Sequence, residues 1–347
     1  MRHLEFGIFL PIAKNGFIAS TTTAQFMPTW ELNRDVTLAC EEHGFEFALS
    51  MVKHRGFGGA TEYWDYALDS YTLMAGLATI TKRIELFPSI ATLTMHPAIC
   101  ARMGVTIDHM SNGRFGLNIV SGWYKDEYQQ MGLWPGDEHY EKRYDYATEY
   151  VTILKELWET GVSDFKGDWF QLDACQCKPL PTRTLPVVCA GQSGRGLRFT
   201  AEMGDRNFVI GDIPKLKEIT AGLNAEAAAV GRSVKTIALN NLFMAETDQE
   251  AQAYFDHIVD GADVEALANI TGQAELDNSE GMSRSLKAKA MFMGLPTLVG
   301  SYQTIADYFD QMAQDTEVAA VMLAFPDFTK DLGDFFKHVW PRLQCRT

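Results

Sequence analysis

Residues 113–128, GRFGLNIVSGWYKDEY, begin as an apolar run and end in a dense group of aromatic and charged side chains. The apolar part has the length and composition of a strand that is covered on both faces, as strands in parallel sheets are. The polar group comes at the carboxyl end of that strand, where parallel α/β barrels carry their functional residues. This stretch therefore predicts a parallel sheet and the edge of the sheet at which a site would lie.

The same pattern recurs along the chain, because apolar strand-like runs alternate with segments of helical period. Strands are predicted at 4–12, 45–52, 84–90, 114–120, 186–191, 206–211, 235–245 and 318–325. The main helical segments are 29–44, 64–83, 96–110, 141–161, 213–231 and 302–314. Eight strands with intervening helices in 347 residues fit an α/β fold of the (β/α)8 TIM-barrel type better than an open doubly wound sheet.

Insertions are expected after strands 2, 4 and 7 of a single domain that spans 1–347. Residues 53–65 follow the second strand, 162–185 resemble a small β-excursion before the fifth, and 262–297 mix helix and loop after the seventh. Long excursions within a compact domain are usually lids or variable surface.

Composition excludes several classes of protein. The 45 acidic and 30 basic residues give a net charge of −15, which argues against nucleic acid as a partner. No apolar run is long enough to span a membrane, and the N-terminal residues lead into a strand without a signal-peptide pattern. We therefore expect a cytoplasmic protein.

The six cysteines are scattered, mostly within apolar runs, and are expected to be reduced thiols. Cys175 and Cys177 could form half of a metal site, but no second pair of Cys or His lies at ligand spacing. We expect no metal.

The loops after the first five strands are rich in aromatic and polar residues, and include AKNGF, KHRGFGG, EYW, ATLTMHP, SGWYKDEY and GQSGRG. Any one of them could be an ordinary surface loop. Together they favour a pocket for a large planar ligand, because aromatic walls and a few polar groups suit such a ligand.

The segment CAGQSGRGLRFTAEMG, 189–204, places small residues between a buried strand and the start of a helix. Such a turn exposes backbone N–H groups that bind phosphate, to which Ser193 could add a hydroxyl and Arg195 a charge. The alternative is a plain turn. Neither a Rossmann nor a Walker A sequence is present, so a mononucleotide phosphate fits best.

Asn118 lies within the apolar run, where an unpaired amide would cost roughly 1–3 kcal/mol. It could face a ligand at the barrel mouth or bond only to backbone. Arg143 and Tyr144 open the helix at 141–161 and could clasp a phosphate, or they could be solvated.

The sequence resembles the bacterial luciferase-like flavin monooxygenases, within them most closely the branch that opens the pyrimidine ring of uracil and includes riboflavin lyase. The resemblance covers most of the chain and rests on stretches such as LEFGIFLPI, FEFALSMVKHRGFGG, GRFGLNIVSGW, QMGLWPGD, KRYDYATEYV, DFKGDWF and CAGQSG.

The resemblance implies FMN contacts at Val52, Lys53, Asn118, Glu127, Arg143, Tyr144 and Ser193. It implies a dioxygen pocket at Leu49, Met51, Ser89, Asn118 and Trp123, in which Asn118, Ser89 and Trp123 act in catalysis. The substrate side is expected at His54, Trp64, Met95, His96 and Tyr124. All of these except Trp64 differ from the residues that the uracil-opening enzymes carry at the same positions.

The resemblance further implies a two-component enzyme in which reduced FMN and O2 form a flavin peroxide that attacks a nitrogen heterocycle. A separate NAD(P)H-flavin reductase would supply the reduced FMN, and a homo-oligomer is expected. Three alternatives stay open: a riboflavin lyase that cleaves the ribityl chain to give lumichrome, a deazaflavin-dependent hydride-transfer enzyme, and a flavin-binding protein without catalysis.

Overall fold

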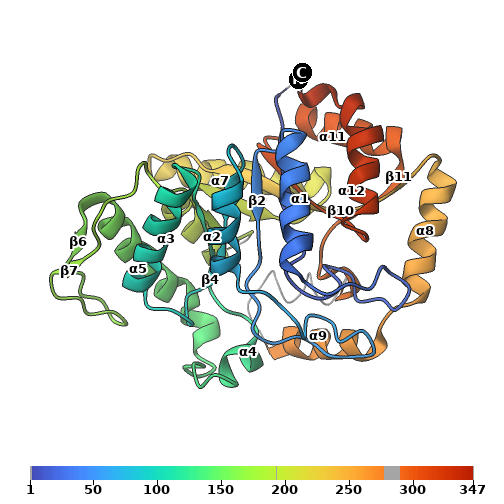
Figure 1. The fold of residues 1–347 in the computed structure, drawn as a ribbon. Coiled ribbons are helices and arrows are strands. Elements are labelled where there is room, and N and C mark those ends of the chain that lie inside the picture. The colour runs from blue at the N-terminus through green and yellow to red at the C-terminus, as the bar shows by residue number, and fades with distance from the viewer. Residues whose placement is uncertain (1, 193, 277–289, 347) are drawn as a thin grey trace.

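The computed structural model describes residues 2–192, 194–276 and 290–346, and its central feature is a barrel of parallel strands surrounded by helices (Figure 1). The barrel strands are β1 Glu5–Phe9, β2 Phe47–Leu49, β3 Glu85–Phe87, β4 Ser89–Ala91, β5 Leu117–Val120, β8 Val187–Cys189, β9 Arg206–Val209, β10 Lys235–Ala245 and β12 Ala320–Ala324. Each lies within or beside one of the eight predicted runs, and the predicted (β/α)8 barrel is confirmed.

The barrel closes through β3 and β4, which are two halves of one predicted strand. Pro88 separates them, and proline has no N–H to give to a sheet ladder. β3 pairs with β2, whereas β4 pairs with β5, so this one segment joins the first and last strands of the sheet order. Every pairing in the barrel is parallel.

The longer helices are α1 Trp30–Glu42, α2 Ser70–Ile80, α3 Pro97–Ser111, α5 His139–Thr160, α6 Gly194–Met203, α7 Ile213–Ala229, α8 Asp248–Asp260, α9 Val264–Leu276 and α11 Tyr302–Asp315. The helix predicted over 64–83 begins only at Ser70. Asp69 caps it by accepting from the N–H of Thr72, and Trp64 has a φ of 63°, which a helix cannot accommodate.

Two of the elements below, β11 and α4, were not predicted, whereas 162–185 was interpreted as a small β-excursion. β11, Thr297–Ser301, adds a parallel strand beside the second half of β10, so residue 297, predicted as the end of an insertion, is in a strand. The short helix α4, Lys125–Gln129, follows β5. Within 162–185, β6 Val162–Ser163 and β7 Cys175–Gln176 form an antiparallel pair. Part of the predicted 262–297 insertion, 277–289, lies outside the described residues.

The interior face of the barrel can be identified from contacts across it. The guanidinium of Arg206 on β9 lies 4.9 Å from the ring centre of Phe87 on β3 and 5.6 Å from that of Phe47 on β2. Strand β9 pairs with neither β2 nor β3, so all three side chains point inward. Arg206 is in register with Lys235, which assigns the alternate residues of β10 from 235 onward to the interior face.

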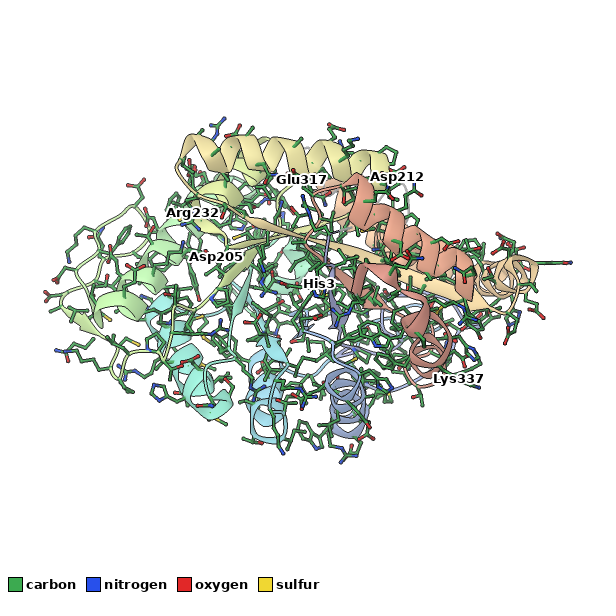
Figure 2. All side chains as sticks on the ribbon, turned by 90° about the horizontal axis from the view of Figure 1, so that it is seen from above. His3, Asp205, Asp212, Arg232, Glu317 and Lys337 are labelled. Carbon is green, nitrogen blue, oxygen red and sulfur yellow. The ribbon has the colours of Figure 1, made fainter. Side chains whose placement is uncertain are left out.

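The two ends of the barrel differ in character. Figure 2 looks onto the amino-terminal ends of the strands, where His3, Asp205 and Arg232 lie in the short segments that lead into strands. Both chain termini are on this side in Figure 1, and α4 and α9 lie at the opposite edge.

Among the described residues, no helix is long and apolar enough to cross a membrane.

Candidate active site

The carboxyl ends of β2 and β5 are joined by a buried ion pair. Lys53 Nζ lies 3.1 Å from Glu127 Oε2, and both side chains are only 4% exposed. The other oxygen, Oε1, accepts from the backbone N–H of His54 at 2.6 Å. Burial lowers the pKa of Lys53, and the adjacent carboxylate of Glu127 partly counteracts this by stabilising the charged ammonium. Helix α4, which the sequence did not predict, is what positions Glu127.

Aromatic rings enclose the ammonium of Lys53 on its remaining sides. The distances from Nζ to the ring centres are 4.7 Å for Tyr124, 5.4 Å for Trp64, 5.5 Å for Phe57 and 5.8 Å for Trp123. The hydroxyl of Tyr124 donates to the carbonyl of Gly56 at 2.9 Å, and burial raises the pKa of Tyr124 to about 12. The phenol is therefore a neutral wall of the site at physiological pH.

We expect Glu127→Gln to leave Lys53 as an unpaired buried cation and to destabilise the fold by about 3–5 kcal/mol near neutral pH. Because the pKa of Lys53 in the folded protein is below its unfolded value, the unfolded state holds this proton more tightly. Raising the pH should therefore recover stability in the variant relative to the wild type. Melting curves between roughly pH 6 and pH 10 would measure this.

The matched control combines Glu127→Gln with Lys53→Met, which removes both charges. Neutral replacement of a buried pair is often tolerated. The double variant should melt higher than Glu127→Gln and show no extra pH dependence. A single variant that melts like the wild type at every pH would contradict the coupling.

A chain of hydroxyl groups holds Asn118 on β5. Its Nδ2 donates to Ser89 Oγ at 2.7 Å, and Ser89 Oγ donates to the carbonyl of Ser50 at 2.6 Å. Ser70 Oγ accepts from the backbone N–H of Ser89 at 2.8 Å. Asn118 is thus bonded to a side chain rather than to backbone only, and its buried Oδ1 has no partner among the described residues.

The turn between β8 and α6 brings two glycines against each other. A Cβ on Gly191 would lie 2.1 Å from the carbonyl oxygen of Gly196, and one on Gly196 would lie 2.7 Å from the hydroxyl of Tyr144. Neither position can carry a side chain without rearrangement. The predicted phosphate ligand Ser193 is in this turn but lies outside the described residues.

Two arginines near this turn have different environments. Arg143 on α5 is 4% exposed, so it is not part of a solvated helix start. Arg195 is exposed, and its guanidinium pairs with both carboxylate oxygens of Asp145 at 2.5 Å. Arg143 is therefore a buried cation whose guanidinium lies 5.3 Å from the ring centre of Tyr144, whereas Arg195 is exposed and pairs with Asp145.

The other predicted residues divide by exposure. Leu49 and Met51 are buried, and Val52 and Met95 are half-buried. His54 and His96 are exposed. His96 caps α3 by accepting from the N–H of Ala98, so its ring has a local structural role, and His54 engages Glu127 through its backbone. The structure therefore does not bring these two imidazoles into the buried group of residues.

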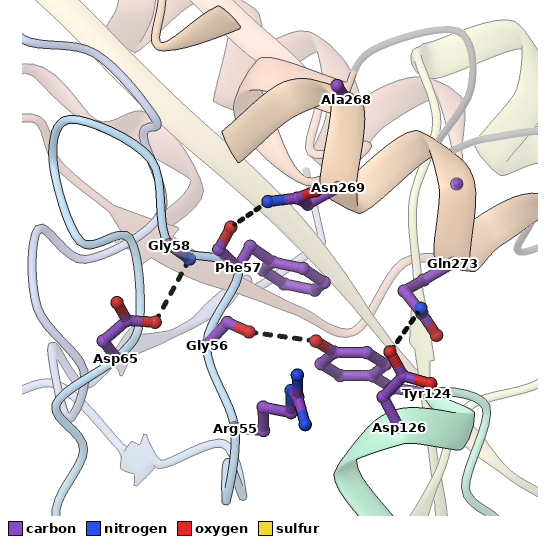
Figure 3. Close-up of a pocket in the computed structure, with 11 residues that line it drawn as sticks. Arg55, Gly56, Phe57, Gly58, Asp65, Tyr124, Asp126, Ala268, Asn269 and Gln273 are labelled. Atoms are coloured by element: carbon purple, nitrogen blue, oxygen red, sulfur yellow. Dashed lines mark hydrogen bonds between the residues drawn. The ribbon is translucent and has the colours of Figure 1, made fainter. Parts of the chain in front are cut away.

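A cavity of about 400 Å³ lies beside Tyr124 and Phe57 (Figure 3). It is lined by residues 55–58, Asp65, Tyr124 and Asp126, and by one face of α9. Helix α9 is held here because Asn269 donates to the carbonyl of Phe57 at 2.8 Å and Gln273 donates to Asp126 at 2.9 Å. No local pattern in the sequence indicates these long-range contacts.

The described residues contain no group of three or more His, Cys, Asp or Glu side chains that could hold a metal. All six cysteines are free. The chemistry at the carboxyl ends of the strands is thus that of two buried cations, a fixed amide, aromatic walls and a glycine turn.

Comparison with known proteins places this arrangement in a family. The luciferase-like monooxygenase pattern matches residues 4–319. The pyrimidine monooxygenase RutA of Rhizobium rhizogenes (strain K84) is 46% identical over 352 residues, covering 99% of this chain and 97% of that protein. RutA of Escherichia coli O127:H6 is 45% identical, with the same coverage.

Solved structures agree on the fold. Riboflavin lyase (RcaE) superposes with a TM-score of 0.82 at 22% identity and covers 98% of this chain and 91% of its own. The long-chain alkane monooxygenase LadA also gives 0.82, at 20% identity, with 100% and 92% covered. On the family pattern and the full-length relatives, this chain belongs to the luciferase-like monooxygenase family.

Proposed function

We propose that this chain is a monooxygenase that consumes reduced FMN and O2 and opens the ring of a pyrimidine-type nitrogen heterocycle. The observation that carries the proposal is the 46% identity, over nearly the whole of both chains, to pyrimidine monooxygenase RutA. Family membership supports oxygenation as the reaction, and the relatives support the substrate class.

The residues at the barrel mouth fit FMN. The close contact of Gly191 with Gly196 keeps side chains out of the turn that leads into α6, and the first N–H groups of a helix suit a phosphate. Arg143 supplies a buried positive charge. The aromatic group around Lys53 suits a flat ring system. We therefore propose that Arg143, Tyr144 and the 190–196 turn, including Ser193, hold the phosphate, and that Val52, Lys53, Asn118 and Glu127 contact the ring.

Reduced FMN, when bound, supplies the electrons that activate dioxygen. The protein's own contribution is binding, orientation and exclusion of water. Asn118 is fixed by Ser89 and offers amide groups where charge develops, and Trp123 and Tyr124 wall the site. Leu49 and Met51 provide an apolar surface for dioxygen, and Trp64 and Met95 border the substrate side.

The alternatives have weaker support. Riboflavin lyase and an F420-dependent secondary alcohol dehydrogenase share the fold at 22% and 15% identity, with TM-scores of 0.82 and 0.75, and such likeness extends to the fold alone. A non-catalytic flavin-binding protein would bind flavin but form no product.

Product identification by mass spectrometry tests the proposal. The protein is supplied with reduced FMN, O2 and, separately, uracil, thymine, riboflavin or FMN. An oxygenated, ring-opened product from a pyrimidine supports it. Lumichrome from riboflavin would indicate the lyase reaction instead. Anaerobic reduction of a substrate, such as a ketone, by hydride transfer from reduced deazaflavin would indicate the hydride-transfer class.

We expect the purified chain to oxidise no NADH or NADPH when given FMN alone, because no Rossmann dinucleotide sequence is present. A separate flavin reductase must therefore supply reduced FMN, and we propose a homo-oligomer as the working assembly. Loss of NADH absorbance at a rate that matches product formation, without an added reductase, would contradict this expectation.

A further inference from the structure

Asn241 lies on the interior face of the barrel, near the carboxyl end of β10. The register from Arg206 to Lys235 assigns residues 235, 237, 239 and 241 to the interior. Asn241 is in register with Ala324 of β12 and Thr297 of β11. Lys235 is the first residue of β10, and Asn241 comes six residues later. Asn241 therefore lies toward the carboxyl ends of the strands, the end of the barrel where Asn118 and Ser89 are found.

The side chain of Asn241 is fully buried, and neither Nδ2 nor Oδ1 has a hydrogen-bond partner in the described part of the chain. Leu239, two residues before it on the interior face, is apolar. Phe243, two residues after it, packs against Tyr254 and Phe255 of α8. A buried amide with both groups unpaired is costly, and buried polar groups in native proteins are nearly always paired. The described part of the chain provides no partner for the amide, which a ligand or a water would supply.

We propose that Asn241 binds the lactam edge of a planar heterocycle, the adjacent N–H and C=O groups of a cyclic amide. A carboxamide presents one donor and one acceptor side by side, which matches that edge in both groups. The inference rests on the proposed function, because both the pyrimidine substrate and the pyrimidine-like ring of the flavin carry such an edge. Either source satisfies the same chemistry.

This assignment adds a specificity determinant to the site. A buried polar group that pairs with the correct ligand is left unpaired by an analogue without the matching group, and such a site rejects the analogue strongly. Asn118 lies on β5, three steps from β10 in the sheet order through β8 and β9. Two amides thus face the barrel interior from well-separated strands.

The test compares Asn241→Leu with Asn240→Leu in the full chain. Asn240 is the adjacent residue, is equally buried and also lacks a partner among the described residues, but it faces the helices outside the barrel. Dissociation constants are measured for FMN, uracil and 1,3-dimethyluracil, which has no N–H. Asn241→Leu should bind a lactam ligand roughly 10–100-fold more weakly, and Asn240→Leu should bind it as the wild type does.

The separate titrations with uracil and with FMN show whether Asn241 binds the substrate or the flavin ring. Loss of uracil affinity alone identifies the substrate, and loss of FMN affinity alone identifies the flavin ring. Weaker binding of 1,3-dimethyluracil than of uracil by the wild type supports the substrate source without any variant. Unchanged affinities for FMN and uracil in Asn241→Leu would mean that the amide holds a buried water only, and would overturn the inference.

Folding and the proposed function are checked independently. Replacing an unpaired buried amide by an apolar side chain of similar size should not lower the melting temperature. Should Asn241→Leu fail to fold, Asn241→Ser, which is smaller and polar, is used in the same titrations. If the wild type forms no oxygenated product from any heterocycle, the proposed function fails, whereas the FMN titration still decides the role of Asn241.

Discussion

Arg143→Met is expected to weaken FMN binding by roughly 100-fold while leaving the affinity for riboflavin nearly unchanged. The proposed phosphate site depends on Arg143 because it is a buried cation, whereas Arg195 is exposed. Truncating one partner of a buried, hydrogen-bonded charge pair costs about 2–5 kcal/mol. A 100-fold loss of affinity corresponds to about 2.8 kcal/mol, which lies within that range. Methionine retains much of the length and apolar volume of the arginine stem. Titration of flavin fluorescence with both ligands measures the two affinities.

The control is Lys142→Met, which removes a neighbouring cation of α5 that is exposed and pairs with Glu138. It should bind FMN like the wild type. Equal loss of FMN and riboflavin affinity in Arg143→Met would show that the residue supports the fold of the mouth rather than the phosphate. Arg143→Lys should fall between the two, because it keeps the charge but not the planar guanidinium.

The barrel could be predicted because its strands are buried on both faces and therefore read as continuous apolar runs. The prediction failed where a segment's structure depends on contacts that its own sequence does not indicate. Residues 297–301 are no more apolar than a loop, and they become a strand because β10 is eleven residues long and extends beyond its other neighbours. The helix at 64–83 was predicted too early, because Trp64 and Asp69 together determine its start.

The site was predictable to a similar extent. Asn118 stood out because an amide within an apolar strand needs a partner, and the 190–196 turn stood out because of its glycines. The ion pair of Lys53 with Glu127 joins residues 74 positions apart, and no local pattern indicates such a contact. Asn241 was not among the predicted site residues. Its unusual property is the absence of a partner among the described residues, which only a structure reveals.

The two histidines predicted for the site are exposed and lie outside the buried group of residues. His54 and His96 were predicted to border the substrate, but His54 engages Glu127 through its backbone and His96 caps a helix. Histidine is useful in catalysis because it titrates near neutral pH, and that property alone does not place it at a reacting atom. The groups that remain at the mouth are the Lys53–Glu127 ion pair, Arg143, amides, hydroxyls and aromatic rings, and we expect them to orient the ligands and exclude water.

Asn118→Leu is accordingly expected to lower the rate of product formation by roughly 10²–10³ while the protein remains folded and retains FMN affinity within a few fold. Ser89 gives its own proton to the carbonyl of Ser50, so it can only accept from Asn118, and this fixes which way the amide faces. One N–H of Nδ2 is used by Ser89, and the second, for which the described residues provide no acceptor, can stabilise negative charge as dioxygen is reduced. Leucine has similar volume but no donor.

Without that donor, electrons from reduced FMN should still reach dioxygen but should be released as hydrogen peroxide rather than incorporated into substrate. The diagnostic measurement is therefore the ratio of hydrogen peroxide to product at equal oxygen consumption, which a general loss of stability would not change. Ser89→Ala serves as the matched variant, because it frees the amide to rotate without removing it, and it should give an intermediate ratio. If Asn118→Leu couples oxygen to product as the wild type does, the amide is not at the reacting atoms; if it fails to fold, its bond to Ser89 is structural.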